Sequence, residues 1–398
     1  MTSGDVAIVG AGVKAPGGTS VEELWRCVGA GRSTARRYPG LPDVLVCQVD
    51  SFDPGAYLSP VQARRLDRAG QLAVAAATDA LDHLKPPAPH RCAVVVGTGF
   101  GSATTWEREH EQLLTGGQRA LGPLTVPMVM PSAAASALSM RFGFTGPALT
   151  VSAACASGAV AIGEGMELLR RGAADLVLAG GVDAMVTYGV LSAFLKLDAL
   201  SRQDGCRPFD AERDGFVLGE GAGVVVLLRA EDARAQGLDV LGVLAGHGQS
   251  SDAHHLVAPD PEGRGALRCM QAALADAGLS ADDVGHVNAH ATGTVAGDLA
   301  EAHALTRLFG GRPVPVTAVK GTTGHLVGGS GAVEAIVTAL SLARGVVPAV
   351  AGLRKVEDAI DLDVVAGLPR QLPPRPALTT SFGFGGANAA LVLRAGQG

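Results

Sequence analysis

Cys155 lies at a junction where a thiol can become reactive. It follows the strand-like run LTVSA and opens the run ASGAVAIGEG, which is rich in small residues and typical of a helix packed closely on its neighbours. A thiol at a helix N-terminus faces the positive end of the helix dipole, which lowers the thiol pKa toward the reactive thiolate. Small neighbours also let a substrate approach the sulfur. A buried, inert cysteine is the alternative interpretation, and this motif alone does not decide between them.

Two histidines and one lysine follow at loops of the same type. His290 lies in HVNAHATGTVAGDLAEA, where a strand leads into a loop of small and hydroxylated residues before Asp298 and Glu301 begin a helix. Lys320 and His325 lie in VTAVKGTTGHLVGGSGAVEA, again between a strand and a helix. The chain has only five lysines, so one inside a Gly-Thr loop is not a routine solvated charge. A single loop histidine is usually structural, whereas two at matching junctions favour a shared role.

A glycine-rich segment near the C-terminus offers backbone donors. The run SFGFGGAN, from Ser381 to Asn388, comes directly after the strand-like ALTT. Gly383, Gly385 and Gly386 permit backbone angles that other residues avoid, and such a loop can direct N–H groups toward a ligand. An ordinary β-turn is the alternative interpretation.

The elements that must position these residues follow an α/β pattern. Short apolar runs alternate with longer alanine-rich amphipathic stretches. The predicted strands are Val6–Val9, Ala93–Val96, Leu149–Val151, Leu176–Ala179, Val224–Leu228, Leu241–Ala245, His286–Asn288, Val314–Thr317, Ala377–Ser381 and Ala389–Leu393. The predicted helices are Val21–Gly29, Pro60–Leu84, Pro131–Phe142, Ser157–Arg171, Gly263–Ala277, Asp298–Phe309 and Ser330–Ala343. Two stretches dense in small residues, 157–165 and 328–335, are expected at the centre of the molecule, between sheets.

Composition excludes several classes of protein. Of 398 residues, 47% are hydrophobic and 18% are charged, which excludes a disordered chain, and 55 are glycine, which indicates close backbone packing. The net charge of −6 argues against a nucleic-acid partner. Six scattered cysteines without a C-x-x-C pair indicate a reducing compartment rather than a disulfide framework. Without a signal peptide or an apolar run long enough for a membrane span, we expect a cytoplasmic protein.

Cofactor and metal motifs are incomplete. The run GAGVKAPGG has Ala15 where the third glycine of a dinucleotide fingerprint belongs, and KGTTGH is not a phosphate-binding loop. EREHEQLL lacks the second histidine of a zinc-binding helix, and the pair His254–His255 has no metal-site spacing. We therefore expect no cofactor and no metal.

Taken in order, the four motifs resemble one family. Cys155, NAHATGT, KGTTGH and SFGFGGAN together form the pattern of the elongating, Cys-His-His type of β-ketoacyl-acyl carrier protein synthase. The resemblance extends over nearly the whole chain and includes the specific block RPFDAERDGFVLGEGAGVVVLL, residues 207–228. The N-terminal VAIVGAG resembles modular polyketide ketosynthases, whereas SFDPGAYLSPVQARRLDR resembles discrete fatty-acid enzymes.

The resemblance implies a fold. Members of this family have the thiolase fold, in which two pseudo-duplicated α/β halves form five layers in the order αβαβα. It places the nucleophile in an N-terminal half, residues 1–240, and the His-His-Lys set with the GFGG loop in a C-terminal half, residues 241–398. It also implies a homodimer, or a heterodimer with a related ketosynthase-like subunit.

The resemblance also implies residue roles. Cys155 would take an acyl group from a carrier-protein thioester, and the N–H groups of Cys155 and Phe384 would form the oxyanion hole. Phe384 would gate the thiol by moving on its flanking glycines, Gly383 and Gly385. His290 and His325 would donate hydrogen bonds to the malonyl thioester as it loses CO₂, and Lys320 would tune this pair. The residues expected to support the site are Glu334, Asp298, Glu301, Thr292 and Thr294.

Two further sets of residues are implied by position in the family pattern. Phe100 and Phe382 would border the acyl pocket, and the phenyl ring of Phe100 would shorten it, so we expect short or compact primers. Arg64, Arg65 and Arg119 would dock an acidic, acyl- or malonyl-loaded carrier protein, with solvated surface arginines as the alternative.

The resulting functional hypothesis is a β-ketoacyl-acyl carrier protein synthase. It would catalyse decarboxylative Claisen condensation of an acyl thioester with a malonyl carrier protein in type II fatty-acid or polyketide synthesis, as an acyltransferase of class EC 2.3.1. One alternative is a thiolase-fold acyltransferase that makes an ester or amide. Another is a non-catalytic partner that resembles a chain-length factor, which the presence of Cys155 disfavours.

Overall fold

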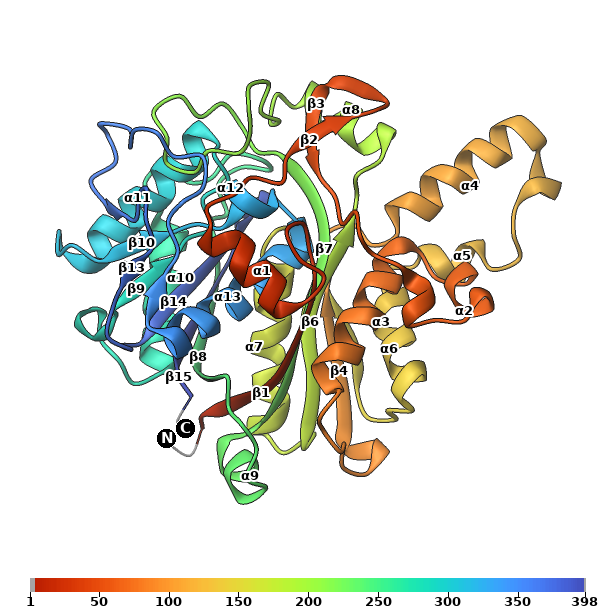
Figure 1. Ribbon diagram of the computed structural model, residues 1–398, viewed down its shortest axis with the longest axis horizontal. Helices are drawn as coiled ribbons and strands as arrows, with labels where there is room; N and C mark the ends of the chain where they lie inside the picture. Colours follow the sequence, from red (N-terminus) through yellow and green to blue (C-terminus); the bar gives the residue numbers. More distant parts are fainter. Residues whose placement is uncertain (1–3, 397–398) are drawn as a thin grey trace.

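A large twisted sheet crosses the centre of the computed structural model, which describes residues 4–396 (Figure 1). In the first half of the chain the strand order is β1, β7, β6, β4, β5. Neighbours along this order pair antiparallel, antiparallel, parallel and parallel. These strands are β1 (Val6–Lys14), β4 (Cys92–Gly97), β5 (Ala148–Val151), β6 (Leu176–Ala184) and β7 (Leu218–Arg229).

The second half of the chain repeats this arrangement. Its order is β8, β15, β14, β9, β10, with the same sequence of antiparallel and parallel pairs. These strands are β8 (Gly242–Ser251), β9 (His286–Asn288), β10 (Pro315–Thr317), β14 (Ala377–Gly383) and β15 (Ala387–Ala395). In each half the first strand pairs with the last, and β1 pairs with β8 to join the halves. The division at residue 240 stays a prediction, which this repetition supports.

Helices complete five layers around the two sets of strands. Helices α7 (Ser157–Arg170) and α13 (Ser330–Arg344) lie in the middle and pack on strands from both halves. Helices α3 (Arg68–Leu81) and α6 (Ala133–Phe142) cover the outer face of the first half. Helix α10 (Arg264–Asp276) covers the second half, with α11 (Val295–Phe309) packed beside it. The predicted α/β thiolase architecture is confirmed.

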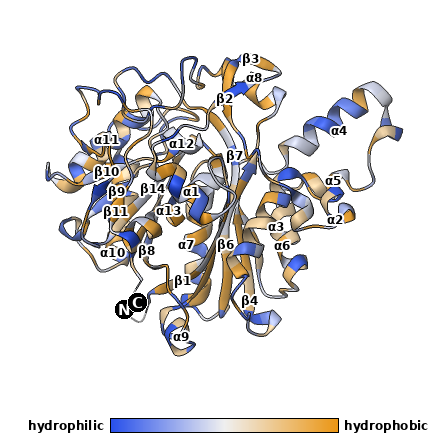
Figure 2. Cartoon of the chain, viewed as in Figure 1, coloured by the Kyte–Doolittle hydropathy of each residue, from blue (hydrophilic) through white to orange (hydrophobic). Residues whose placement is uncertain are grey.

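Glycines allow the central layer to pack backbone against backbone. A Cβ atom on Gly158, in α7, would lie 2.6 Å from the carbonyl oxygen of Gly328. A Cβ atom on Gly181, in β6, would lie 2.1 Å from that same oxygen. Neither contact is sterically possible, so both positions require glycine. Figure 2 shows hydrophobic residues concentrated in the central strands and α7, whereas α4 (Ala103–Gly116) carries hydrophilic residues along much of its length.

The predicted strands and helices are confirmed, with one helix divided and several elements missed. The helix expected over Pro60–Leu84 is two helices, α2 (Pro60–Arg64) and α3, because Asp67 accepts a hydrogen bond from Ala69 N and begins a new helix. Helix α1 (Val21–Gly29) has its predicted bounds. The elements that the sequence analysis missed are β2 (Arg36–Tyr38), β3 (Leu41–Cys47), β11 (Val346–Val347), β12 (Asp363–Val364), β13 (Arg370–Gln371), α4, α5 (Thr125–Val129), α8 (Tyr188–Lys196), α9 (Ala230–Ala235) and α12 (Lys320–Thr323). Helix α4 projects from the body of the molecule (Figure 1). Across residues 4–396, no helix is both long and apolar enough to span a membrane.

Candidate active site

A strained turn places Cys155 between β5 and α7. Ala154 has a φ of +48°, in the left-handed region that residues other than glycine rarely adopt, and such strain occurs often at functional sites. Ser157, the first residue of α7, holds the turn, because its hydroxyl accepts a hydrogen bond from Ala153 N at 2.9 Å and donates one to Ala154 O at 2.6 Å. Cys155 retains 8% exposure. The thiol is therefore held in place and largely buried.

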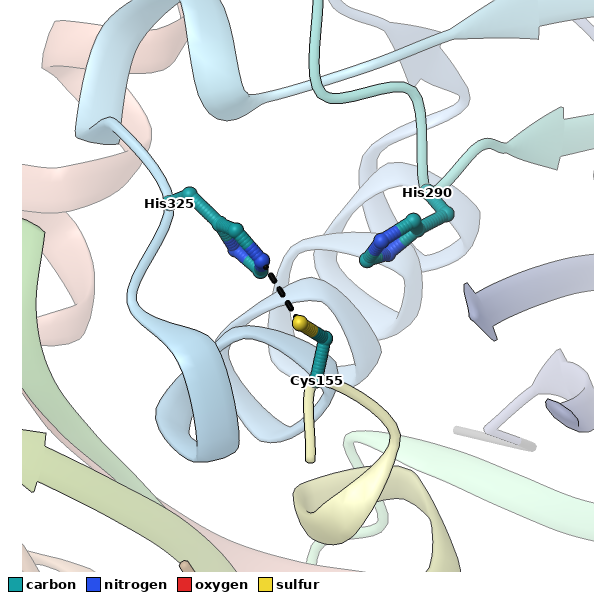
Figure 3. Close-up of side chains that lie close together, drawn as sticks. All are labelled: Cys155, His290 and His325. Carbon is teal, nitrogen blue, oxygen red and sulfur yellow. Dashed lines mark hydrogen bonds between the residues drawn. The ribbon is translucent and has the colours of Figure 1, made fainter. Parts of the chain in front are cut away.

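His325 lies against this thiol. Its Nε2 is 2.9 Å from the Sγ of Cys155, as Figure 3 shows. His325 follows α12, and its Nδ1 lies 3.0 Å from the hydroxyl of Ser330, the first residue of α13. The ring of Phe216 packs edge-on against the imidazole, with 5.4 Å between ring centroids. The imidazole is thus held on three sides.

His290, the second histidine of the site, lies in the loop between β9 and α11. Its ring centroid is 5.4 Å from that of His325, and both rings point toward Cys155 (Figure 3). The backbone N–H of His290 donates to Glu301 Oε1 at 2.9 Å and to Thr380 Oγ1 at 3.0 Å. These bonds fix the loop at the point where the imidazole leaves it.

Lys320 reaches His290 from within the protein. Its Nζ lies 3.3 Å from His290 Nδ1, and it also donates hydrogen bonds to His290 O and to Glu334 Oε1. Lys320 and Glu334 are 0% and 1% exposed, so they form a fully buried ion pair. An ammonium group has only donors, so Nδ1 of His290 must accept from it. The proton of His290 consequently lies on Nε2, toward the cavity.

Burial sets the protonation of the two imidazoles. Burial, with the Lys320 ammonium nearby, holds the pKa of each histidine well below its usual range. Both imidazoles are therefore neutral near pH 7. They can donate hydrogen bonds without carrying a charge.

The expectation of a lowered thiol pKa is wrong. Burial raises the pKa of Cys155 to about 12, and the nearby Asp183 carboxyl adds to the rise. The Lys320 ammonium and the N–H groups of Phe384 and Cys155 lower it without overcoming burial. Without substrate the sulfur thus carries its proton, because a thiolate at so dry a site loses its hydration.

The N–H groups of Cys155 and Phe384 both lie close enough to the sulfur to lower its pKa, which is compatible with the predicted oxyanion hole beside it. Gly383 permits this approach, since a Cβ atom there would lie 2.8 Å from Ala153 O and 3.1 Å from Cys155 N. Gly385, with a φ of +79°, donates to the carbonyl of Leu256 at 2.8 Å. The structure therefore brings the glycine loop to the thiol.

Buried acids hold the loop that carries His290. Glu301 accepts hydrogen bonds from His290 N, Ala291 N and the hydroxyl of Thr380. Asp298 accepts from Gly293 N at 3.1 Å, and burial raises the pKa of its carboxyl to about 7. Both acids are on α11 and act through the backbone rather than at the sulfur.

The catalytic side chains open onto a cavity of about 400 Å³. Cys155, His290 and His325 border it together with Phe382, Phe384, Met185, Phe194, Phe216, Thr292 and Thr294. The hydroxyls of Thr292 and Thr294 lie 3.0 Å apart.

Phe100 is half exposed and is not among the described residues that line the cavity, because the loop after β4 turns its ring to the surface. The prediction that Phe100 borders the acyl pocket is therefore wrong, whereas Phe382 does border the cavity as predicted.

Comparisons with known proteins agree with this geometry. Residues 3–233 match the model for "Beta-ketoacyl synthase, N-terminal domain", and residues 241–354 match the model for "Beta-ketoacyl synthase, C-terminal domain". The chain belongs to the β-ketoacyl synthase family.

Individual relatives cover almost the full chain. The 3-oxoacyl-[acyl-carrier-protein] synthase 2 of Staphylococcus aureus is 36% identical over 404 residues, covering 98% of each protein. The solved ishigamide ketosynthase/chain length factor matches with a TM-score of 0.93 at 33% identity, covering 98% of this chain and 99% of that one. A type II polyketide synthase acyl-carrier protein in complex with its ketosynthase, bound to a hexaketide, matches with a TM-score of 0.91 at 27% identity over 98% and 99% of the chains.

Three residues of this β-ketoacyl synthase escaped the sequence analysis. Ser330 and Phe216 contact His325, and Asp183 is a fully buried carboxylate that accepts from Gly99 N and Gly328 N, each at 2.7 Å. Asp183 thereby connects the loop after β4 to the loop after His325. The acidic residue in the apolar strand sequence LVLAGGVDA was the available signal.

The three reactive side chains also have the composition of a metal site, since the ligand atoms of Cys155, His290 and His325 lie within 4.8 Å of one another. The buried Lys320 ammonium, 3.3 Å from His290 Nδ1, opposes a second cation at this position. The donor set therefore fits proton and hydrogen-bond chemistry better than metal binding.

The arginines expected to dock a carrier protein lie away from the cavity lining. Arg64 and Arg65 are exposed around the end of α2, and Arg119 is exposed between α4 and α5. These elements lie on the same side of the molecule (Figure 1). Their part in docking stays a prediction.

Proposed function

We propose that this protein is a 3-oxoacyl-acyl carrier protein synthase that joins an acyl thioester to a malonyl thioester with loss of CO₂. The observation that carries this proposal is the meeting of one thiol and two neutral imidazoles at a single buried cavity, with Cys155 Sγ 2.9 Å from His325 Nε2. Each group supplies what one half-reaction needs.

In the first half-reaction Cys155 attacks the carbonyl carbon of an acyl carrier thioester. A C–S bond forms to Cys155, the C–S bond to the carrier breaks, and the proton lost by Cys155 ends on the carrier thiol. Nε2–H of His325, 2.9 Å from Sγ, would donate a hydrogen bond to the sulfur as that proton leaves. The N–H groups of Cys155 and Phe384 hold the negative oxygen of the tetrahedral intermediate, and a donor of this kind is worth about 3 kcal/mol in the barrier.

In the second half-reaction the malonyl thioester takes the place of the departed carrier. Its C–C bond to the carboxylate breaks, CO₂ leaves, and the electron pair becomes an enolate on the thioester oxygen. The Nε2–H groups of His290 and His325 point toward the cavity and would donate to that oxygen. The carbanion then attacks the acyl-Cys155 carbonyl, forming the new C–C bond and releasing the Cys155 thiolate, which takes up a proton.

The intact set of groups favours this function over the alternatives. A chain-length factor would lack the nucleophile, and Cys155 is present and faces the cavity. An acyltransferase forming an ester or amide needs no enolate, so it would not require the buried Lys320–Glu334 pair beside His290.

We also propose that the enzyme uses compact primers, for a reason other than Phe100, which does not line the cavity. Sites for small molecules commonly measure roughly 300–1,000 Å³. The cavity of about 400 Å³ must also admit the carrier's flexible arm, and the bulky side chains of Met185, Phe194 and Phe216 are part of its lining. These side chains leave little space for a long chain.

The partners follow from the same reasoning. We propose that the exposed arginines Arg64, Arg65 and Arg119 attract an acidic carrier protein. The edge strand β5 and its surroundings expose apolar side chains, Leu149 at 43% and Met140 at 76%, which supports pairing with a second copy or a related subunit. Six buried free thiols support a reducing compartment, the cytoplasm.

Intact-protein mass spectrometry tests the proposal. The protein is incubated with acyl carrier proteins of increasing chain length and then with malonyl carrier protein, with C155A as the control. We expect an acyl adduct on the wild type alone, followed by a 3-oxoacyl carrier product. Acylation without chain extension would favour the ester- or amide-forming enzyme, and rapid acylation by C12–C16 groups would contradict compact primers.

A further inference from the structure

The two catalytic imidazoles differ in what faces their inner nitrogen. Nδ1 of His290 faces the Lys320 ammonium at 3.3 Å, whereas Nδ1 of His325 faces the Ser330 hydroxyl at 3.0 Å. Ser330 is 2% exposed and begins α13, so its hydroxyl is held by the helix and shielded from water. In the sequence HLVGGSGAV, nothing indicated that the Ser330 hydroxyl contacts His325.

Counting hydrogens settles the direction of the Ser330 bond. The hydroxyl oxygen already accepts a hydrogen bond from Leu326 N at 2.9 Å. Its own hydrogen needs an acceptor, and among the described residues Nδ1 of His325 is the acceptor in range. A buried hydroxyl hydrogen without an acceptor is unfavourable, so the hydroxyl donates and Nδ1 accepts. The imidazole proton then lies on Nε2, which faces Cys155 Sγ at 2.9 Å.

We propose that Ser330 is a positioning residue that fixes His325 in the tautomer with its proton on Nε2. Through this one hydroxyl, α13 determines which nitrogen of His325 offers a donor to the cavity. The tautomer is inferred from the contacts of His325 alone. Its catalytic effect, a second hydrogen bond to the enolate oxygen, rests on the proposed function. Lys320 and Ser330 thus do the same task for the two histidines by different chemistry.

Replacing the hydroxyl should change the tautomer before it changes the fold. In S330A, Nδ1 loses its donor, so the proton distributes over both ring nitrogens. We expect the rate of malonyl decarboxylation to fall about tenfold with little change in KM, because the lost donor acts chiefly on the developing enolate. S330T, which keeps a hydroxyl, should restore both the tautomer and most of the rate.

A matched control exists in the same helix. Ser341 is also buried, and its hydroxyl donates to Val337 O at 3.0 Å, away from His325. S341A therefore removes a comparable buried hydroxyl without touching the imidazole. It should leave the tautomer and the decarboxylation rate unchanged, which separates a positioning role from general loosening of α13.

Nitrogen-15 NMR of labelled histidine side chains tests the inference directly. The His325 signals are assigned by their loss in H325N. We expect the wild type to show a proton on Nε2 and an unprotonated Nδ1, with a mixture of tautomers in S330A. A wild-type proton on Nδ1, or an unchanged spectrum in S330A, would overturn the inference. If S330A does not fold, the spectra of the wild type and S330T decide. A wild type with the expected tautomer but no 3-oxo product would contradict the proposed function and leave the role of Ser330 intact.

Discussion

Replacing Lys320 by methionine should damage stability and activity together. Lys320 and Glu334 are 0% and 1% exposed, so K320M leaves a carboxylate buried without its partner. Breaking a buried pair in this way costs about 3–5 kcal/mol of the free energy of unfolding. His290 also loses the ammonium group at its Nδ1 and the donor at its carbonyl oxygen.

The pH dependence of unfolding should identify Glu334 as the source of that cost. Burial raises the pKa of Glu334 in the folded protein, so as pH rises the unfolded chain loses this proton first, near the ordinary value of about 4.3. The free energy of unfolding therefore falls as pH rises above that value, until the folded carboxyl also ionises. In K320M the fall should extend to higher pH than in the wild type, because the ammonium that favours the carboxylate is absent.

Urea unfolding of K320M, E334Q and the double variant at several pH values is the assay. We expect the double variant to be more stable than K320M near pH 7, since neither position 320 nor position 334 then carries a charge. K14M is the control, because Lys14 is also a buried lysine in an ion pair, with the partly exposed Asp79, outside the site. It should lose stability and keep the decarboxylation rate. A K320M protein with wild-type stability and a wild-type pH slope would refute the reasoning.

Three further outcomes are expected. G383A should lose Cys155 acylation by at least tenfold in a mass-spectrometric time course, because a Cβ atom there lies 2.8 Å from a backbone oxygen; acylation at the wild-type rate would show that the loop need not approach so closely. Decarboxylation should stay level from about pH 7 to pH 6, because the pKa values of His290 and His325 lie well below the ordinary value of about 6.5; a fall centred near that value would mean that an imidazole becomes protonated in this range. R64E, alone or with R65E, should raise KM for the carrier-bound substrate and spare a small thioester mimic; an unchanged KM would remove both arginines from the docking surface.

Elements could be predicted from the sequence where the residue types themselves indicate burial or close packing. Apolar runs form buried strands because their side chains are most stable away from water. Cys155, His290 and His325 stand out because each lies in a run of small residues between a strand and a helix. The small-residue stretch near 157–165 was placed centrally because only a surrounded helix needs such residues, and α7 lies there.

Properties that depend on several distant segments were not predictable in the same way. The pKa of Cys155 is raised chiefly by burial. An argument from the dipole of one helix does not include that burial, because it depends on segments distant in the sequence. The break at Asp67 depends on one capping side chain inside a long helical pattern. Phe100 was assigned to a pocket by its place in a motif, and the direction of its ring depends on the fold around the loop.

A single-turnover measurement with malonyl carrier protein labelled at its free carboxyl group tests the central claim most directly. Acyl-Cys155 protein should release labelled CO₂ and form 3-oxoacyl carrier product in equal amounts. The H290A variant should still form the acyl adduct on Cys155 but lose both later products together. Formation of the 3-oxo product at the wild-type rate in H290A, or release of an ester or amide without CO₂, would contradict the account.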